Sequence, residues 1–207
     1  MVQWILMDRR APLVRAWRRA FADTPVQVQT GDITESARGH AWVSPANSFG
    51  WMDGGLDWTI RQAYAQAGCD ITAAVQGKIQ QEAAGELPVG QALVVPTPNT
   101  PYTHLVVAPT MRTPRPALWT LNAYLAFRAI LFAAQQWNDA HQDGQDDQSR
   151  PIVTVYCPGL ATGVGRMPPG RCARQMRAAW DQVMQPRDTL LPLTRLTMLE
   201  QSLRYRS

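Results

Sequence analysis

The chain has 207 residues, of which 45% are apolar, and a formal net charge of +4. This length and apolar content predict one domain with a sizeable core. No stretch approaches the roughly 20 consecutive apolar residues that cross a membrane, and the charges at residues 8–10, after a short apolar run, have the wrong order for a secretory signal. We therefore expect a soluble cytoplasmic protein with no membrane partner.

The cysteines suggest neither a metal site nor a disulfide framework. Cys69, Cys157 and Cys172 are an odd number, and none belongs to a CxxC pair or to a Cys/His spacing typical of zinc. We therefore expect reduced, mostly buried thiols, no metal ion and no bound cofactor.

Basic residues are densest between Arg9 and Arg19. An arginine-rich helix face is most often a solvated surface, but such charge also suits a phosphate or a nucleic acid. Charge alone leaves these alternatives open.

The chain begins with alternating strand and helix patterns. A short apolar strand at 4–7 precedes a helix that opens at Pro12 and repeats apolar residues at helical spacing. Alternating residues at 26–33 and a buried run at 41–47 predict the next two strands.

The middle of the chain predicts two helices and then two strands. An apolar stripe over 56–67 ends at Gly68, and a further helix is expected over about 70–84. The β-branched runs 91–97 and 104–110, separated by a Pro/Asn/Thr turn, predict neighbouring strands.

The last third contains a long apolar helix pattern and a second glycine-rich loop. Residues 117–137 predict a helix that is buried on more than one side, and the polar residues 141–150 predict an exposed loop. A strand at 151–157 leads into the glycine-rich segment 158–170, and Pro168 opens the helix that follows. Beyond about residue 186 the pattern assigns no element.

Alternating strands and helices predict an α/β fold, a three-layer α/β/α sandwich with a central mixed β-sheet. Ligands of such sheets bind outside the carboxyl ends of the strands. The glycine-rich segments 47–57 and 158–170 both lie there, each before a helix whose free N–H groups and dipole favour a phosphate. Two such loops at one edge predict a diphosphate ligand.

Four short motifs occur in a definite order: "GDI" at 31–33, "PAN" at 45–47, "GGLD" at 54–57 and "ATGVGRMP" at 161–168. Their order and spacing resemble the macrodomain family, the ADP-ribose-binding α/β/α module with Gly-Asp-Ile/Val, Asn-Ala-Ala-Asn, Gly-Gly-Val-Asp and Ser-Thr-Gly-Val/Ile motifs. The spacing from Asn47 to Asp57 is also that of the family.

The resemblance covers residues 26 to about 184. It implies a single macrodomain-like domain over 1–207, with an N-terminal strand and helix extension at 1–25 and a C-terminal extension at 185–207.

The resemblance also implies a role for individual residues at the adenine and distal ribose ends. Asp32 would accept a hydrogen bond from the adenine amine, with the Ile33 amide beside it, and Asn47 would hold a hydroxyl of the distal ribose. From the residues alone, Asp32 also suits an Asx-turn and Asn47 a turn cap at the strand end.

Glycines in both loops would leave room for the diphosphate, because a β-carbon would block its approach to the backbone. Gly54 and Gly55 would form one side, and residues Thr162, Gly163, Val164 and Gly165 would wrap the other. Asp57 would help to activate a water against the anomeric carbon, although its place also suits a plain helix-dipole carboxylate.

Some residues depart from the family pattern. Ser44 replaces the first asparagine and would contact the ligand from that position. Asp53 stands where the family usually has glycine, so it is either a loop-structuring residue or a second catalytic acid. Gly165 replaces the aromatic residue that often stacks on the distal ribose, and the neighbouring Arg166 could pair with a phosphate.

The implied function is ADP-ribose binding with hydrolysis of an ADP-ribosyl bond or of a phosphate on ADP-ribose derivatives, with catalytic candidates Asn47, Asp57 and Asp53. The alternative is a reader that binds ADP-ribose or ADP-ribosylated macromolecules without turnover. Nucleic-acid binding by the Arg9–Arg19 segment is a third alternative, which predicts steeply salt-dependent binding.

Overall fold

The computed structural model describes residues 2–36, 40–144, 146, 148–185 and 189–205. Its elements follow in chain order: β1 (Gln3–Asp8), α1 (Ala11–Ala20), β2 (Gln27–Thr30), the 3₁₀ helix η1 (Ile33–Glu35), β3 (Ala41–Ser44), α2 (Gly55–Gln66), α3 (Ile71–Ala83), β4 (Leu93–Pro96), β5 (His104–Val107), α4 (Asn122–Ala140), β6 (Thr154–Cys157), α5 (Pro169–Met184) and α6 (Leu193–Tyr205).

The strands form one six-stranded sheet in the order β2-β1-β6-β3-β5-β4. All neighbouring pairs are parallel except β4 and β5, which are antiparallel, so the predicted mixed sheet is confirmed. Strands β3, β5 and β6 are buried at every position, as expected for parallel strands covered on both faces.

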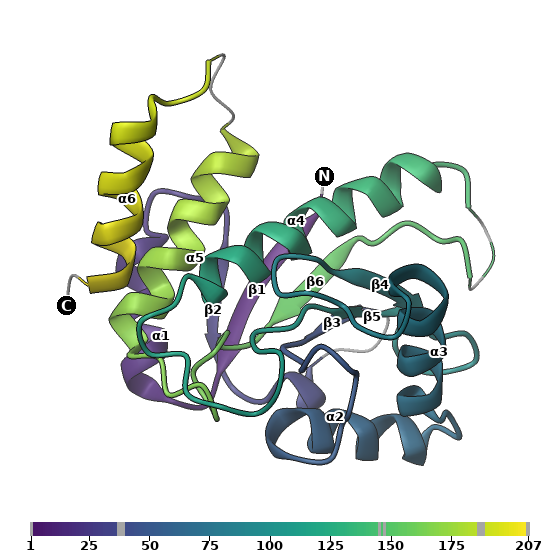
Figure 1. The fold of residues 1–207 in the computed structure, drawn as a ribbon. Helices are drawn as coiled ribbons and strands as arrows, with labels where there is room; N and C mark the ends of the chain where they lie inside the picture. Colours follow the sequence, from purple (N-terminus) through teal and green to yellow (C-terminus); the bar gives the residue numbers. More distant parts are fainter. Residues whose placement is uncertain (1, 37–39, 145, 147, 186–188, 206–207) are drawn as a thin grey trace.

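Two apolar cores lie on opposite faces of this sheet. The helices on the two sides of the sheet make the fold three-layered, as predicted (Figure 1). Residues alternate between the two faces along β3, where Val43 joins the core beneath α1, α4 and α5 and Trp42 joins the core beneath α2 and α3. The alternation follows from the two-residue period of a strand.

The predicted helix over 117–137 is wrong at its beginning, because the helix starts at Asn122 and ends at Ala140. Residues 117–121 form a turn, in which the Thr120 hydroxyl donates to the Ala117 carbonyl at 2.8 Å. The Tyr124 N–H, in the first turn of α4, donates to Gln175 Oε1 on α5 at 3.2 Å. A cap supplied from another helix leaves no local pattern in the sequence.

Helix α6 is the long helix that the sequence pattern does not assign. It lies beside α5 in Figure 1, and Leu203 is its buried residue. Among the described residues, none of the helices has the length and apolar content to cross a membrane.

Candidate functional site

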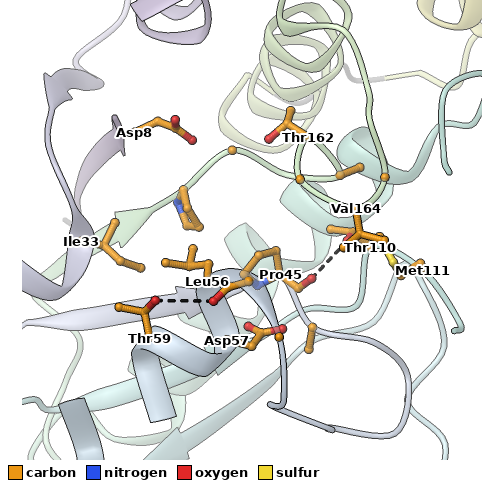
Figure 2. A pocket seen from close by; sticks show the side chains of 18 of the residues that line it. Asp8, Ile33, Pro45, Leu56, Asp57, Thr59, Thr110, Met111, Thr162 and Val164 are labelled. Atoms are coloured by element: carbon orange, nitrogen blue, oxygen red, sulfur yellow. Dashed lines mark hydrogen bonds between the residues drawn. The ribbon is translucent and has the colours of Figure 1, made fainter. Parts of the chain in front are cut away.

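A pocket of about 630 Å³ lies at the carboxyl ends of the parallel strands (Figure 2). Its wall is built from the segments that follow β1, β2, β3, β5 and β6 and from the first turn of α2. This volume is in the range of small-molecule and cofactor sites. The lining includes the following predicted residues: Asp32, Ile33, Asn47, Asp53, Gly54, Gly55, Asp57, Thr162, Gly163, Val164 and Gly165. The predicted residues Ser44 and Arg166 both lie outside this lining.

The first glycine loop lines the pocket at the start of α2, where Gly54 and Gly55 border it. Gly54 is the N-cap residue, without a side-chain cap hydrogen bond, and Gly55 has a φ of +58° that favours glycine. A β-carbon at either glycine would meet no atom within 4 Å, so packing does not require the absence of a side chain. The two glycines therefore leave open space beside N–H groups that the helix does not use.

Asp57 lies in the first turn of α2, beneath this loop. Ser44, at the end of β3, is 1% exposed, and its hydroxyl donates to Asp57 Oδ1 at 2.6 Å. Asp57 lines the pocket and keeps some exposed surface, but protein atoms surround most of its carboxyl group. This burial raises the pKa of Asp57 to about 6, against the opposing effect of the Ser44 hydrogen bond.

Asp53 is a second carboxylate in the pocket. It is exposed, and its negative charge contributes further to the raised pKa of Asp57. Among the described residues, no group of three or more His, Cys, Asp or Glu side chains is arranged to hold a metal ion. The effect of Asp53 on Asp57 is therefore the repulsion between two negative charges, which raises the pKa of Asp57.

Asn47 organises the loop that follows β3. Its Oδ1 accepts from the N–H groups of Phe49 at 3.1 Å and Trp51 at 3.3 Å, and its Nδ2 donates to the Trp51 carbonyl at 2.8 Å. These bonds give Asn47 the turn-capping role that the sequence leaves open. An amide nitrogen carries two hydrogens, so one more remains for a group in the pocket.

Asp32 lies at another part of the pocket and caps η1. Its Oδ1 accepts from the Thr34 N–H at 2.9 Å and from the Thr34 hydroxyl at 2.8 Å. Its Oδ2 pairs with the Arg9 guanidinium at 2.5 Å, and Ile33 beside it is buried. A ligand donor at Asp32 would therefore share Oδ2 with Arg9.

The second glycine loop follows β6 and faces the first across the pocket. A β-carbon at Gly163 would meet nothing within 4 Å, whereas one at Gly165 would lie 2.4 Å from the Ala161 carbonyl oxygen. Gly163 thus borders open space, and Gly165 is required by the turn itself. Val164 is 56% exposed, and Arg166 is exposed with a φ of +53°.

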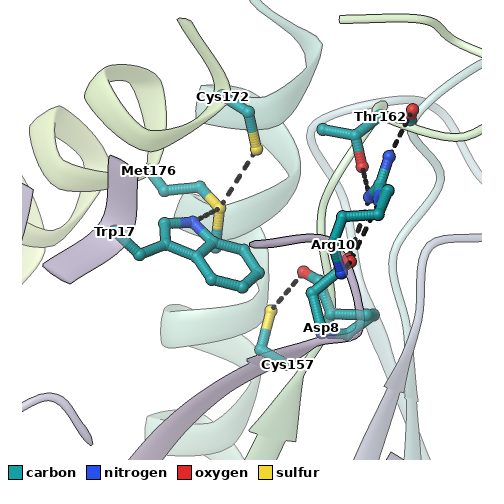
Figure 3. A network of polar contacts seen from close by, with 8 residues as sticks. Asp8, Arg10, Trp17, Cys157, Thr162, Cys172 and Met176 are labelled. Carbon is teal, nitrogen blue, oxygen red and sulfur yellow. Dashed lines mark hydrogen bonds and ion pairs between the residues drawn. The ribbon is translucent and has the colours of Figure 1, made fainter. Parts of the chain in front are cut away.

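Asp8 and Arg10 line the pocket and are absent from the site residues predicted from the sequence. Figure 3 shows Arg10 between Asp8 and Thr162. Arg10 binds both Asp8 and Thr162, which is 152 positions further along the chain. Their sequence signal is the charged Asp-Arg-Arg segment at the carboxyl end of the first strand, at the edge where ligands bind. The density of arginines around Arg10 favours a solvated surface, and this signal therefore does not identify Arg10 as a pocket residue.

Comparison with known proteins identifies the family of the chain. A family model described as Macro domain matches residues 43–176. The chain belongs to the macrodomain family. It is also similar to an uncharacterized protein of Aeropyrum pernix, which is 27% identical over 168 residues that cover 80% of this chain and 75% of the relative.

Solved macrodomains share the fold. The macrodomain of Mycobacterium tuberculosis DarG matches with a TM-score of 0.56 and 19% identity, over 74% of this chain and 88% of that chain. A variant of the Oceanobacillus iheyensis macrodomain with ADPR matches with a TM-score of 0.54 and 21% identity, over 76% of this chain and 77% of that chain. At these identities the similarity establishes the macrodomain α/β fold.

Proposed function

We propose that this macrodomain binds ADP-ribose in the pocket and hydrolyses an ADP-ribosyl bond or a phosphate of an ADP-ribose derivative. The family, the position of the pocket and the Oceanobacillus iheyensis neighbour with ADPR support the ligand. Its macromolecular partner would be an ADP-ribosylated protein or nucleic acid.

The ligand would extend between the two glycine loops. The adenine would lie at Asp32 and Ile33, and the diphosphate would bind between Gly54, Gly55 and the loop at 162–165. This arrangement directs the N–H groups at the start of α2 toward negative charge. The distal ribose would then lie near Asn47 and Asp57.

The observation that carries the hydrolytic proposal is the carboxyl group of Asp57. A general base works best with a pKa near the operating pH, and burial raises the pKa of Asp57 to about 6. At pH 7 such a group is ~90% ionised, so it can accept a proton and later return it. A carboxylate needed only to cap a helix would not require this desolvation.

In the proposed step, a bond to the water oxygen replaces the bond to the leaving group, and one proton is transferred. Asp57 takes a proton from a water molecule while the water oxygen bonds to the anomeric carbon, or to phosphorus for a phosphate ester. The bond from that atom to the leaving group breaks with its electron pair, and the leaving group receives the proton from Asp57 or from solvent. Backbone N–H groups of the two loops would hold the diphosphate throughout.

A non-catalytic reader is the second candidate, and Asn47 favours it. Its side chain is engaged by Phe49 and Trp51 in the loop, so a single amide hydrogen remains for the sugar. A reader would bind ADP-ribose and release no product from any ADP-ribosyl substrate.

The test compares Asp57→Asn with Asp53→Asn on mono-ADP-ribosylated protein and on ADP-ribose phosphate. Asp57→Asn should lower the rate by ~10²- to 10⁴-fold, the usual contribution of general acid-base catalysis, and should keep ADP-ribose affinity within about tenfold, ~1.4 kcal/mol. Asp143→Asn, an exposed carboxylate in the polar loop, is the matched control.

The results separate the candidates. Wild-type rates for Asp57→Asn together with a large loss for Asp53→Asn would transfer the role of base to Asp53. If wild-type protein turns over neither substrate but binds ADP-ribose, the reader is the correct function.

A further inference from the structure

We propose that Arg10, braced by Asp8, is a positioning residue that holds the second glycine loop in the shape that receives the ligand diphosphate. This inference rests on the proposed function. Both residues lie outside the stretch 43–176 that matches the family model. The N-terminal strand and helix would therefore complete the site.

Asp8 fixes one edge of the Arg10 guanidinium. Arg10 Nε donates to Asp8 Oδ1 at 2.9 Å and Nη2 donates to Asp8 Oδ2 at 2.9 Å, a paired geometry that sets the plane of the group. The Arg10 backbone N–H also donates to Asp8 Oδ1 at 2.8 Å. The turn from β1 into α1 and the side chain are thus held by the same carboxylate.

The other edge of the guanidinium holds Thr162. Arg10 Nη1 donates to the Thr162 carbonyl at 2.8 Å, and Nη2 donates to the Thr162 hydroxyl at 2.5 Å (Figure 3). One planar group therefore fixes both the backbone and the side chain at the start of the loop. A neutral side chain could not make this set of bonds.

Gly159 leaves the space that this arrangement needs. A β-carbon there would lie 2.5 Å from Thr162 Oγ1 and 2.8 Å from Arg10 Nη2, both too close for ordinary contact. Leu13 Cδ2 on α1 would also lie 2.5 Å away, so Arg10, Thr162 and Leu13 together exclude a side chain at Gly159, whereas Gly163 borders the open pocket.

The loop also has a backbone that needs support. Ala161 has a φ of +57° and Arg166 a φ of +53°, a region that residues with a β-carbon rarely adopt. Such conformations persist where surrounding contacts enforce them, and they often occur at ligand sites. Arg10 contacts the residue directly after Ala161, and the Ala117 N–H holds the Gly165 carbonyl at 2.7 Å on the far side.

The contribution of Arg10 is geometric, since Asp8 offsets its charge. Fixing Thr162 sets the direction of the N–H groups that follow it, including that of Gly163 at the open pocket. A ligand that carries a diphosphate gains from this preorganisation, whereas adenosine, which lacks one, does not.

Calorimetry with ADP-ribose and with adenosine tests this inference in the whole 207-residue chain. Arg10→Gln should weaken ADP-ribose binding by at least tenfold and adenosine binding by less than twofold, and Arg10→Lys should recover part of the loss. Arg15→Gln, which removes an exposed arginine of α1, controls for net charge and should match wild type. Equal losses for both ligands, or wild-type affinity for ADP-ribose, would overturn the positioning role.

Thr162→Val provides an independent arm because it removes one hydroxyl and keeps the side-chain shape. It should also weaken ADP-ribose more than adenosine, and the double variant with Arg10→Gln should lose less than the product of the two single losses. If Arg10→Gln does not fold, an unchanged ADP-ribose affinity of Thr162→Val still overturns the inference. Failure of wild type to bind ADP-ribose would overturn the proposed function as well.

Discussion

Replacing Ser44 with alanine should raise the pKa of Asp57 above its present value of about 6. The Ser44 hydroxyl donates to Asp57 Oδ1 at 2.6 Å and favours the ionised carboxylate, which opposes the effect of burial. A hydrogen bond to a charged group contributes ~1.5 to 3 kcal/mol, which corresponds to ~1 to 2 pKa units. We therefore expect a pKa of ~7 to 8 in Ser44→Ala.

This shift has a specific kinetic consequence. At pH 7 the ionised fraction of Asp57 should fall from ~90% to between ~10% and ~50%. The rate at pH 7 should fall by the same factor, and it should recover at higher pH, where the carboxyl group ionises again. A variant that merely distorted the pocket would not recover.

Two measurements on Ser44→Ala test whether the Ser44 hydroxyl lowers the pKa of Asp57. A carbon-13 NMR titration of the Asp57 carboxyl group gives the pKa without any need for turnover, and a pH-rate profile gives the acid limb. Ser202→Ala, on the distant helix α6, is the matched control. An Asp57 pKa that stays at about 6 or falls in Ser44→Ala would refute the role of this hydrogen bond.

Further predictions concern stability. Asp57→Asn should raise the free energy of unfolding at pH 7 by up to about 3 kcal/mol. Burial raises the pKa of Asp57 from its ordinary value of 3.8 to about 6 in the folded state. The stability of the wild-type protein therefore falls as the pH rises from 3.8 to about 6, and the asparagine variant avoids this loss. Equal urea midpoints for the two proteins at pH 7 would contradict this. His104 is buried, and burial lowers its pKa from 6.5 to about 4, so the stability of the folded protein falls as the pH drops from 6.5 toward 4. His104→Leu should therefore shift the midpoint of acid unfolding to lower pH. An unshifted midpoint would contradict this role of His104. Gln175→Ala should cost ~1 to 3 kcal/mol because the buried amide joins Thr120 and Leu203 and accepts the Tyr124 N–H. A denaturation midpoint like that of wild type would rule out this role.

The fold and the position of the pocket could be predicted because their signals are local. A strand, a glycine-rich loop and a helix N-terminus follow one another at 41–66 and again at 154–184, and this order puts both loops at one sheet edge. The antiparallel pairing of β4 with β5 likewise follows from two β-branched runs around a short turn. These arrangements need no information from distant parts of the chain.

Contacts between distant segments could not be predicted in the same way. The family pattern places Ser44 at the ligand, but its hydroxyl donates to Asp57. Arginine density favours a solvated face for Arg10, yet this residue binds Thr162, which lies 152 positions further along the chain. In both cases the residue type fits several roles, and only the packing of β1, β3 and β6 selects one.

Helix boundaries at the C-terminal side show the same limit. Residues 117–121 have the apolar composition of the helix that follows, but a local bond from the Thr120 hydroxyl to the Ala117 carbonyl and a tertiary bond from Arg171 to the Leu118 carbonyl hold them in a turn. Helix α6 buries Leu203 and leaves Leu193 and Met198 exposed, so it lacks a full amphipathic stripe. Its packing on α5 depends on Gln175, which donates to the Leu203 carbonyl at 3.2 Å.

Calorimetric titration of the wild-type protein with ADP-ribose tests most directly whether this pocket binds that ligand. We predict a saturable isotherm with one site per chain and an affinity that falls at least tenfold in Asp32→Ala, which removes the proposed acceptor for the adenine amine. The absence of heat at millimolar ADP-ribose, confirmed by unchanged backbone amide NMR shifts at Gly55 and Gly163, would contradict ADP-ribose binding by this pocket.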